Sequence, residues 1–133
     1  RTGEHSDNRF RYVKPQGHIG GFVDVVCSPY AQPGRVAVGS IHHIAFRIEH
    51  NQRQRLYRIQ LNDEHFNVSP ILDRTYFQSI YFREPGGILF EIATDPPGFT
   101  VDETLESLGT KLCLPETMEA NRSTIESRLP PLI

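Results

Sequence analysis

Residues 72–98 read LDRTYFQSIYFREPGGILFEIATDPPG, two apolar runs separated by a short turn. The runs Thr75–Arg83 and Ile88–Thr94 are rich in β-branched and aromatic residues, which favour β-strands. Between them, Glu84–Gly87 (EPGG) carries the proline and glycines that are typical of a tight reversal of the chain. The stretch therefore predicts a β-hairpin.

A further strand precedes this hairpin in the sequence. Residues 41–48 read IHHIAFRI, and the alternation of a strand places His43 on one face and His42 on the other. The face with His42 carries more apolar side chains, so we expect it to meet the core. The adjacent histidines raise the question of whether either binds a metal ion.

Between strand and hairpin, the spacing of the apolar residues predicts an amphipathic helix over Asn51–Asp63, with Leu56, Ile59 and Leu61 toward a sheet. Residues 68–72 favour a short strand. The order over residues 40–95 is then β-α-β-β-β. The predicted fold class is α+β, with a mixed, curved sheet and one covering helix.

The sequence also contains an internal repeat. GGFVDVVCSP at 20–29 resembles GGILFEIATDP at 86–96, and such repeats indicate duplicated units. We therefore expect residues 1–38 to hold the end of a preceding, truncated β-α-β-β-β module plus a linker, with the first 12 residues frayed. Residues 39–96 would form a complete module, and residues 97–133 a C-terminal tail with short helices.

Composition narrows the class of protein. The 133 residues are 38% hydrophobic and 23% charged, as in a globular chain, and the net charge of -2 gives no footprint for nucleic acid. No apolar run approaches the roughly 20 residues of a membrane span. The first residues lack leader features, so we expect a cytoplasmic protein, with Cys27 and Cys113 as reduced thiols.

Two residues stand out chemically. Glu91 lies amid apolar residues in its predicted strand, and a carboxylate there is costly unless it is paired or binds a metal. His43 lies on the less apolar face of its own strand. Imidazole and carboxylate together suit Fe(II), Mn(II) or Zn(II). From the residues alone, a solvent-facing Glu91, or one that faces an arginine across the sheet, is an equally open interpretation.

The stretches GSIHHIAFR (39–47) and LDRTYFQSIYFREPGGILFEIATDPPG (72–98) resemble the C-terminal part of ring-cleaving dioxygenases. These belong to the glyoxalase/bleomycin-resistance/extradiol dioxygenase (vicinal oxygen chelate) superfamily, and the resemblance is to its hydroquinone-type branch. It covers residues 17–133. It implies paired β-α-β-β-β modules that enclose a metal, and cleavage of a small dihydroxylated aromatic ring with O₂.

The resemblance also implies a metal site. The metal would be Fe(II), with Mn(II) as the alternative, held by two histidines and one glutamate. His43 and Glu91 match two of these ligands, and the third is expected from an N-terminal half that is absent here. The remaining histidines, which we expect to be exposed, are His5, His18, His50 and His65. With two protein ligands, metal affinity should be low.

By the same resemblance, His42, Arg74 and Tyr81 match catalytic positions near the substrate. Arg74 and Tyr81 flank the hairpin that carries Glu91, which makes proximity plausible. Strict alternation, however, points His42 away from His43, so only a bulge or a bend at the strand end would bring it to the metal.

The same resemblance leaves two alternative functions open for this chain on the same scaffold. One is a glyoxalase-like lyase or isomerase with a non-redox metal. The other is a metal-free binding module of the bleomycin-resistance type, in which two chains pair. We expect a homo-oligomer, because a dimer would cover the sheet of a single module.

Overall fold

The computed structural model describes residues 2–14, 21–32 and 34–130 of the chain. It divides into two compact units, residues 1–40 and 41–133, which are described separately here. Within the described ranges, no helix has the length and apolar character that crossing a membrane requires.

The first unit is a three-stranded antiparallel sheet. Its strands are β1 (Thr2–Ser6), β2 (Arg9–Val13) and β3 (Phe22–Val26), in the order β1-β2-β3. The expectation that the first 12 residues are frayed is therefore wrong. Polar composition suggested a loose end, but β-pairing depends on backbone groups, and β2 pairs with β3 along its whole length.

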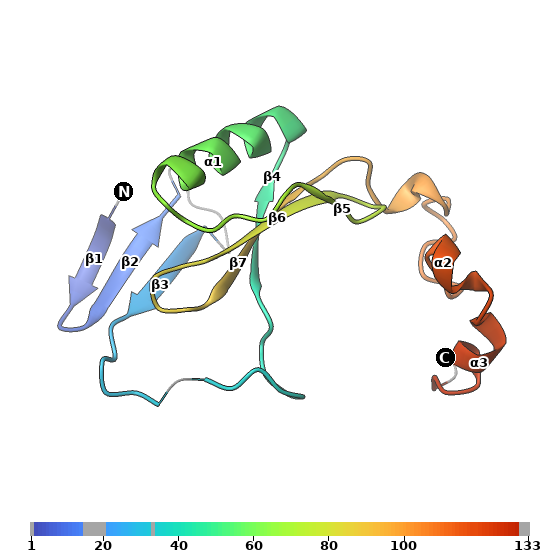
Figure 1. Ribbon diagram of the computed structural model, residues 1–133, viewed down its shortest axis with the longest axis horizontal. Coiled ribbons are helices and arrows are strands. Elements are labelled where there is room, and N and C mark those ends of the chain that lie inside the picture. Colours follow the sequence, from blue (N-terminus) through green and yellow to red (C-terminus); the bar gives the residue numbers. More distant parts are fainter. Residues whose placement is uncertain (1, 15–20, 33, 131–133) are drawn as a thin grey trace. The chain divides into compact units, whose positions relative to one another are not determined.

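The second unit contains the β-α-β-β-β order that the sequence predicts (Figure 1). Its elements are β4 (Ile44–Ile48), α1 (Asn51–Asp63), β5 (Leu72–Asp73), β6 (Gln78–Arg83) and β7 (Leu89–Thr94). The sheet order is β4-β7-β6-β5; β4 runs parallel to β7, and the other pairs are antiparallel. The α+β class with a mixed sheet and a covering helix is confirmed.

Short helical turns follow the sheet in the sequence. They are η1 (Phe99–Val101), α2 (Glu116–Glu119) and α3 (Arg122–Glu126). Arg122 donates to both Glu119 and Glu126, which links the last two turns.

The hairpin turn between β6 and β7 is built by its own residues. Gly87 has a φ of 90°, a conformation that side chains disfavour, and its N–H donates to the carbonyl of Glu84. The Glu84 carboxylate in turn accepts from the backbone N–H groups of Gly86 and Ile88. The turn thus fixes the register in which β7 follows β6.

The core lies between α1 and one face of the sheet, and Figure 1 shows the helix over the strands. Its buried apolar residues are Ile48, Val68, Ile80 and Ile92. Aromatic rings extend it, since Phe90 makes edge-to-face contacts with Phe46 and Phe82. Burial of this apolar face contributes to the packing of the helix on the sheet.

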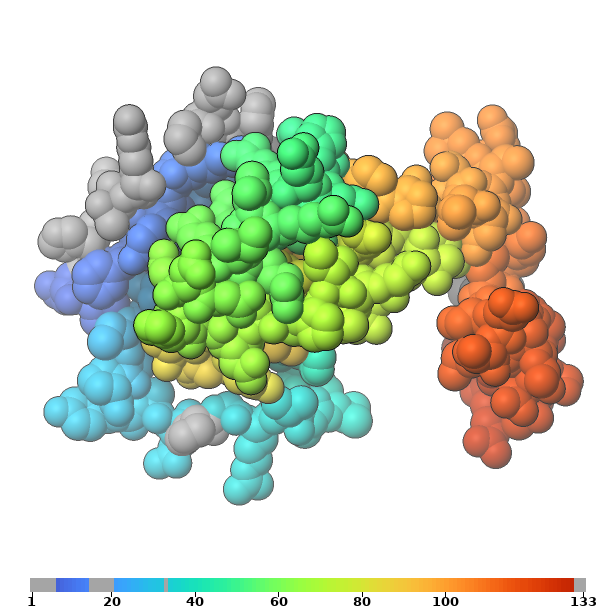
Figure 2. Space-filling model, turned by 45° about the horizontal axis from the view of Figure 1, so that its top comes forward, coloured from blue at the N-terminus to red at the C-terminus, as the bar shows by residue number. Residues whose placement is uncertain are grey.

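The predicted bounds of α1 are confirmed, but its predicted buried face is only partly right, since of its three apolar residues Leu61 alone packs against the core. Leu56 and Ile59 are exposed, whereas Gln54 is fully buried. The Gln54 side-chain amide donates to the backbone oxygens of Gln78 and Ile92, at 2.8 and 2.7 Å. The surface of α1 is open to view in Figure 2. The side of this helix that faces the sheet therefore carries the hydrogen-bonded Gln54 as well as the apolar Leu61.

Candidate metal centre

Glu91 lies in β7, the strand between β4 and β6. It is opposite Ala45 in β4 and Tyr81 in β6. Its neighbour Ile92 belongs to the core, so Glu91 points to the face of the sheet opposite α1. Even there, Glu91 is only 3% exposed.

Three side chains converge on the Glu91 carboxylate. The Oε2 atom lies 2.7 Å from Nε2 of His43. The other oxygen, Oε1, accepts from the hydroxyl of Tyr81 at 2.8 Å and from the hydroxyl of Ser79. His43 is partly exposed and its ring also makes an edge contact with the ring of Tyr81. The structure therefore brings the imidazole and the carboxylate together on one face.

The two less specific interpretations of Glu91 do not describe its surroundings. It does not face solvent, and among the described residues no lysine or arginine forms an ion pair with it. An acid paired with arginines across a sheet is found instead at Asp24, which accepts from Arg9 and Arg11. Arg11 foremost lowers the pKa of Asp24 to about 2. The two strand acids of the internal repeat thus have different partners.

The donor set around Glu91 fits a divalent first-row metal. An imidazole nitrogen and a carboxylate oxygen are ligands that Fe(II), Mn(II) and Zn(II) accept. Ligand atoms about 2.1 Å from a shared ion, at right angles, lie roughly 3 Å apart. The 2.7 Å between Nε2 of His43 and Oε2 of Glu91 is close to that separation. The described part of the chain supplies two such ligands on this face.

His42 lies closer to His43 than strand alternation suggests. The structure begins β4 at Ile44, so residues 41–43 precede the strand and do not alternate. Nδ1 of His42 lies 2.9 Å from Nδ1 of His43. The expectation that His42 faces away from His43 is therefore wrong. That expectation assumed a strand that already begins at Ile41, whereas β4 begins at Ile44.

The remaining predicted residues take different places. The guanidinium of Arg74 lies 5.5 Å from the centre of the Tyr81 ring, which connects Arg74 to the group around Glu91. Of the other histidines, His50 and His65 are exposed, as expected. His18 lies outside the described residues, as does the side chain of His5.

Ser79 was missed by sequence reasoning. It is fully buried in β6 and its hydroxyl contacts Glu91. The available signal was its position two residues before Tyr81, which places both hydroxyls on one face of the strand. Without the register between β6 and β7, nothing in the sequence connects Ser79 with Glu91.

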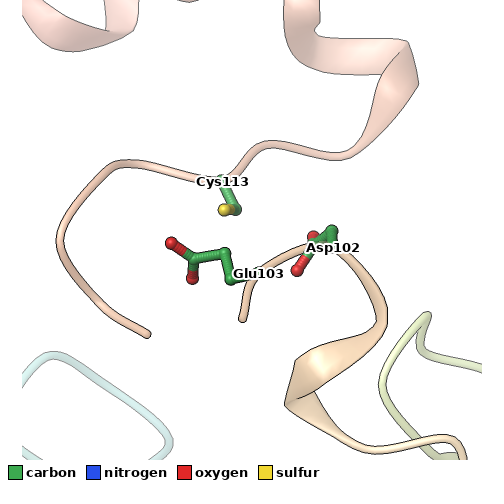
Figure 3. A group of neighbouring side chains, drawn as sticks. All are labelled: Asp102, Glu103 and Cys113. Carbon is green, nitrogen blue, oxygen red and sulfur yellow. The ribbon is translucent and has the colours of Figure 1, made fainter. Parts of the chain in front are cut away.

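A second group of potential ligands lies in the chain after the sheet. Figure 3 shows the side chains of Asp102, Glu103 and Cys113 near one another, and their ligand atoms lie within 4.8 Å. Partial burial, followed by the charges of Asp102 and Glu103, raises the pKa of the Cys113 thiol. The Tyr76 hydroxyl also donates to Asp102.

Several known proteins that resemble this chain are named as dioxygenases. It is 43% identical to MhqO of Bacillus subtilis (strain 168), which is named as a ring-cleaving dioxygenase, over 98% of this chain and 41% of the relative. It is 34% identical to a chlorohydroquinone/hydroquinone 1,2-dioxygenase of Sphingobium indicum, over 84% of this chain and 36% of that protein. Over most of its length, the chain is therefore similar to a part of these proteins that are named ring-cleaving dioxygenases.

A solved structure shows the same similarity. The crystal structure of a protein titled as a dioxygenase from Bacillus subtilis superposes on this chain with a TM-score of 0.88 and 41% identity, covering 100% of this chain and 42% of the other. No protein-family model matches the chain. The chain spans about two fifths of the length of the curated relatives.

Proposed function

We propose that this chain is the C-terminal, metal-holding part of a non-haem Fe(II) dioxygenase that cleaves dihydroxylated aromatic rings with O₂. The observation that carries the proposal is the buried carboxylate of Glu91, whose Oε2 atom lies 2.7 Å from Nε2 of His43. Similarity to a hydroquinone 1,2-dioxygenase supports a hydroquinone-type ring as the substrate class.

In this proposal His43 and Glu91 hold the metal, and His42 orients His43. If Nδ1 of His43 carries the proton, it donates to Nδ1 of His42, 2.9 Å away. The lone pair on Nε2 of His43 is then free for the metal, since a ring nitrogen that carries a proton cannot coordinate a metal ion.

Tyr81 and Arg74 would face the substrate. The Tyr81 hydroxyl donates to Glu91, and its oxygen can still accept from a phenolic O–H. The guanidinium of Arg74, near the Tyr81 ring, supplies positive charge that favours a phenolate over a phenol. Bound iron would supply the exchange of electrons between ring and O₂, while these side chains orient the ring and handle its proton.

The proposal also covers the organisation of the chain. Residues 39–96 form one complete module, residues 1–38 the end of a preceding module with its linker, and residues 97–133 a tail. The third metal ligand comes from sequence beyond these 133 residues. The span of about two fifths of the relatives supports a longer protein, which we place in the cytoplasm as a homo-oligomer.

The test is metal content and oxygen uptake of the full-length protein with a hydroquinone. We expect stoichiometric iron and oxygen consumption that depends on the hydroquinone. Glu91→Gln should abolish both. Asp95→Asn is the matched control, because Asp95 follows the same strand but is paired with Arg47 rather than with His43.

Other outcomes identify the alternatives. Zinc or nickel without oxygen uptake would overturn the dioxygenase and indicate the lyase or isomerase. A protein that takes up no metal would indicate the binding module. The isolated 133-residue chain should consume no oxygen, since it supplies two of the three ligands.

A further inference from the structure

Ser79 is fully buried and contacts the Glu91 carboxylate. In the sheet it is paired with Ala93, and Tyr81 is paired with Glu91. Ser79 therefore reaches Glu91 diagonally across the two strands, on the same face as Tyr81. The small side chain of Ala93 occupies the position directly opposite Ser79.

Both hydroxyls donate to the same oxygen of Glu91. Tyr81 reaches Oε1 at 2.8 Å, and Ser79 donates to Oε1 as well. A carboxylate oxygen has about two acceptor positions, so these two donors fill Oε1. Oε2 is the oxygen that faces His43, at 2.7 Å. The two oxygens of Glu91 thus have separate partners.

We propose that Ser79 is a positioning residue that makes Glu91 bind its metal through Oε2 alone. This inference rests on the proposed metal centre at His43 and Glu91. A carboxylate that binds through both oxygens takes two positions around an ion, whereas one that binds through a single oxygen takes one. With Oε1 occupied by Ser79 and Tyr81, a further position around the ion stays open for small molecules.

Mn²⁺ binding to the full-length protein, in which the third ligand is present, tests this without any turnover. Ser79→Ala removes one donor and keeps the side chain small. We expect its Mn²⁺ affinity to fall by about 10-fold to 100-fold, as is typical when a partner of a ligand is removed. The infrared separation between the asymmetric and symmetric carboxylate stretches should also narrow, since Glu91 can then use both oxygens. Ser79→Thr, which keeps the hydroxyl, should restore both values.

Thr94→Val is the matched control. Thr94 is also buried in the same hairpin, but its hydroxyl lies on the other face, where it accepts from the backbone of Gln78. We expect Thr94→Val to lower stability and to leave the carboxylate stretches of the Mn²⁺ complex unchanged. Far-UV circular dichroism checks that each variant is folded.

The outcomes separate the inference from the proposed function. If Ser79→Ala binds Mn²⁺ as tightly as the unsubstituted protein, with the same infrared separation, the role of Ser79 is refuted and the metal centre stands. The role of Ser79 is also refuted, and the metal centre stands, if Glu91 already binds Mn²⁺ through both oxygens in the unsubstituted protein. The same conclusion follows if Thr94→Val changes the carboxylate stretches as much as Ser79→Ala does. If the unsubstituted protein and Glu91→Gln bind Mn²⁺ alike, the metal centre and this inference are both overturned.

Discussion

Replacing Gln54 by leucine should destabilise the second unit although it makes the core more apolar. Gln54 is fully buried, and its amide donates to the backbone oxygens of Gln78 and Ile92. The helix is thereby hydrogen-bonded to two different strands. Leucine has a similar volume, so Gln54→Leu removes the two donors while leaving little empty space.

The size of the effect follows from these contacts. Each buried carbonyl that loses its donor costs about 1–3 kcal/mol. The substitution also removes Oε1 of Gln54, which is buried without a partner among the described residues, and this relieves a cost of the same order. We therefore expect a net loss of about 2 kcal/mol in the free energy of unfolding.

Urea unfolding followed by circular dichroism measures this loss, and Gln52→Leu is the control. Gln52 lies on the same helix but is exposed, so the identical substitution there should change the free energy by less than about 0.5 kcal/mol. If both substitutions have the same effect, the two hydrogen bonds of Gln54 do not hold the helix to the sheet.

Two further predictions concern titrating groups outside the metal centre. Arg11 lowers the pKa of Asp24 to about 2, so the stabilisation from this carboxylate should be complete above the ordinary aspartate pKa and be lost as the pH falls toward 2. A carboxyl titration by NMR should show the Asp24 pKa rising in Arg11→Gln; an unchanged pKa would refute the pairing. Partial burial and the charge of Asp102 raise the pKa of Cys113, so in a Cys27→Ser background Asp102→Asn should shift iodoacetamide alkylation to lower pH. An unshifted pH profile would show that the Asp102 charge does not act on the thiol.

Much of the second unit could be predicted from sequence because its signals are local. The turn at Glu84–Gly87 and the bounds of Asn51–Asp63 depend on neighbouring residues, and both are confirmed. The buried side of the helix could not be predicted in the same way. Leu56 is exposed and Gln54 buried because strand carbonyls far away in the sequence determine the orientation.

The candidate site likewise contains residues that local sequence signals predict and residues that only the strand register reveals. His43 and Glu91 were predicted as ligands because each is an unusual residue within its predicted strand, and Arg74 and Tyr81 came from resemblance to a family. Ser79 could not be found, since a serine in a strand is unremarkable until the register places it beside a carboxylate. The partner of His42 depended on where β4 begins, and strand ends are the least predictable feature of a sequence.

The parallel pairing of β4 with β7 has a consequence for how the chain folds. These are the first and last strands of the four-stranded sheet in sequence, so we expect them to pair after the intervening chain has formed its own local contacts. We expect His43 and Glu91 to become neighbours only when these two strands pair. An ion bound by both side chains would therefore slow unfolding far more than it speeds folding, and adding it should lengthen the lifetime of the native state.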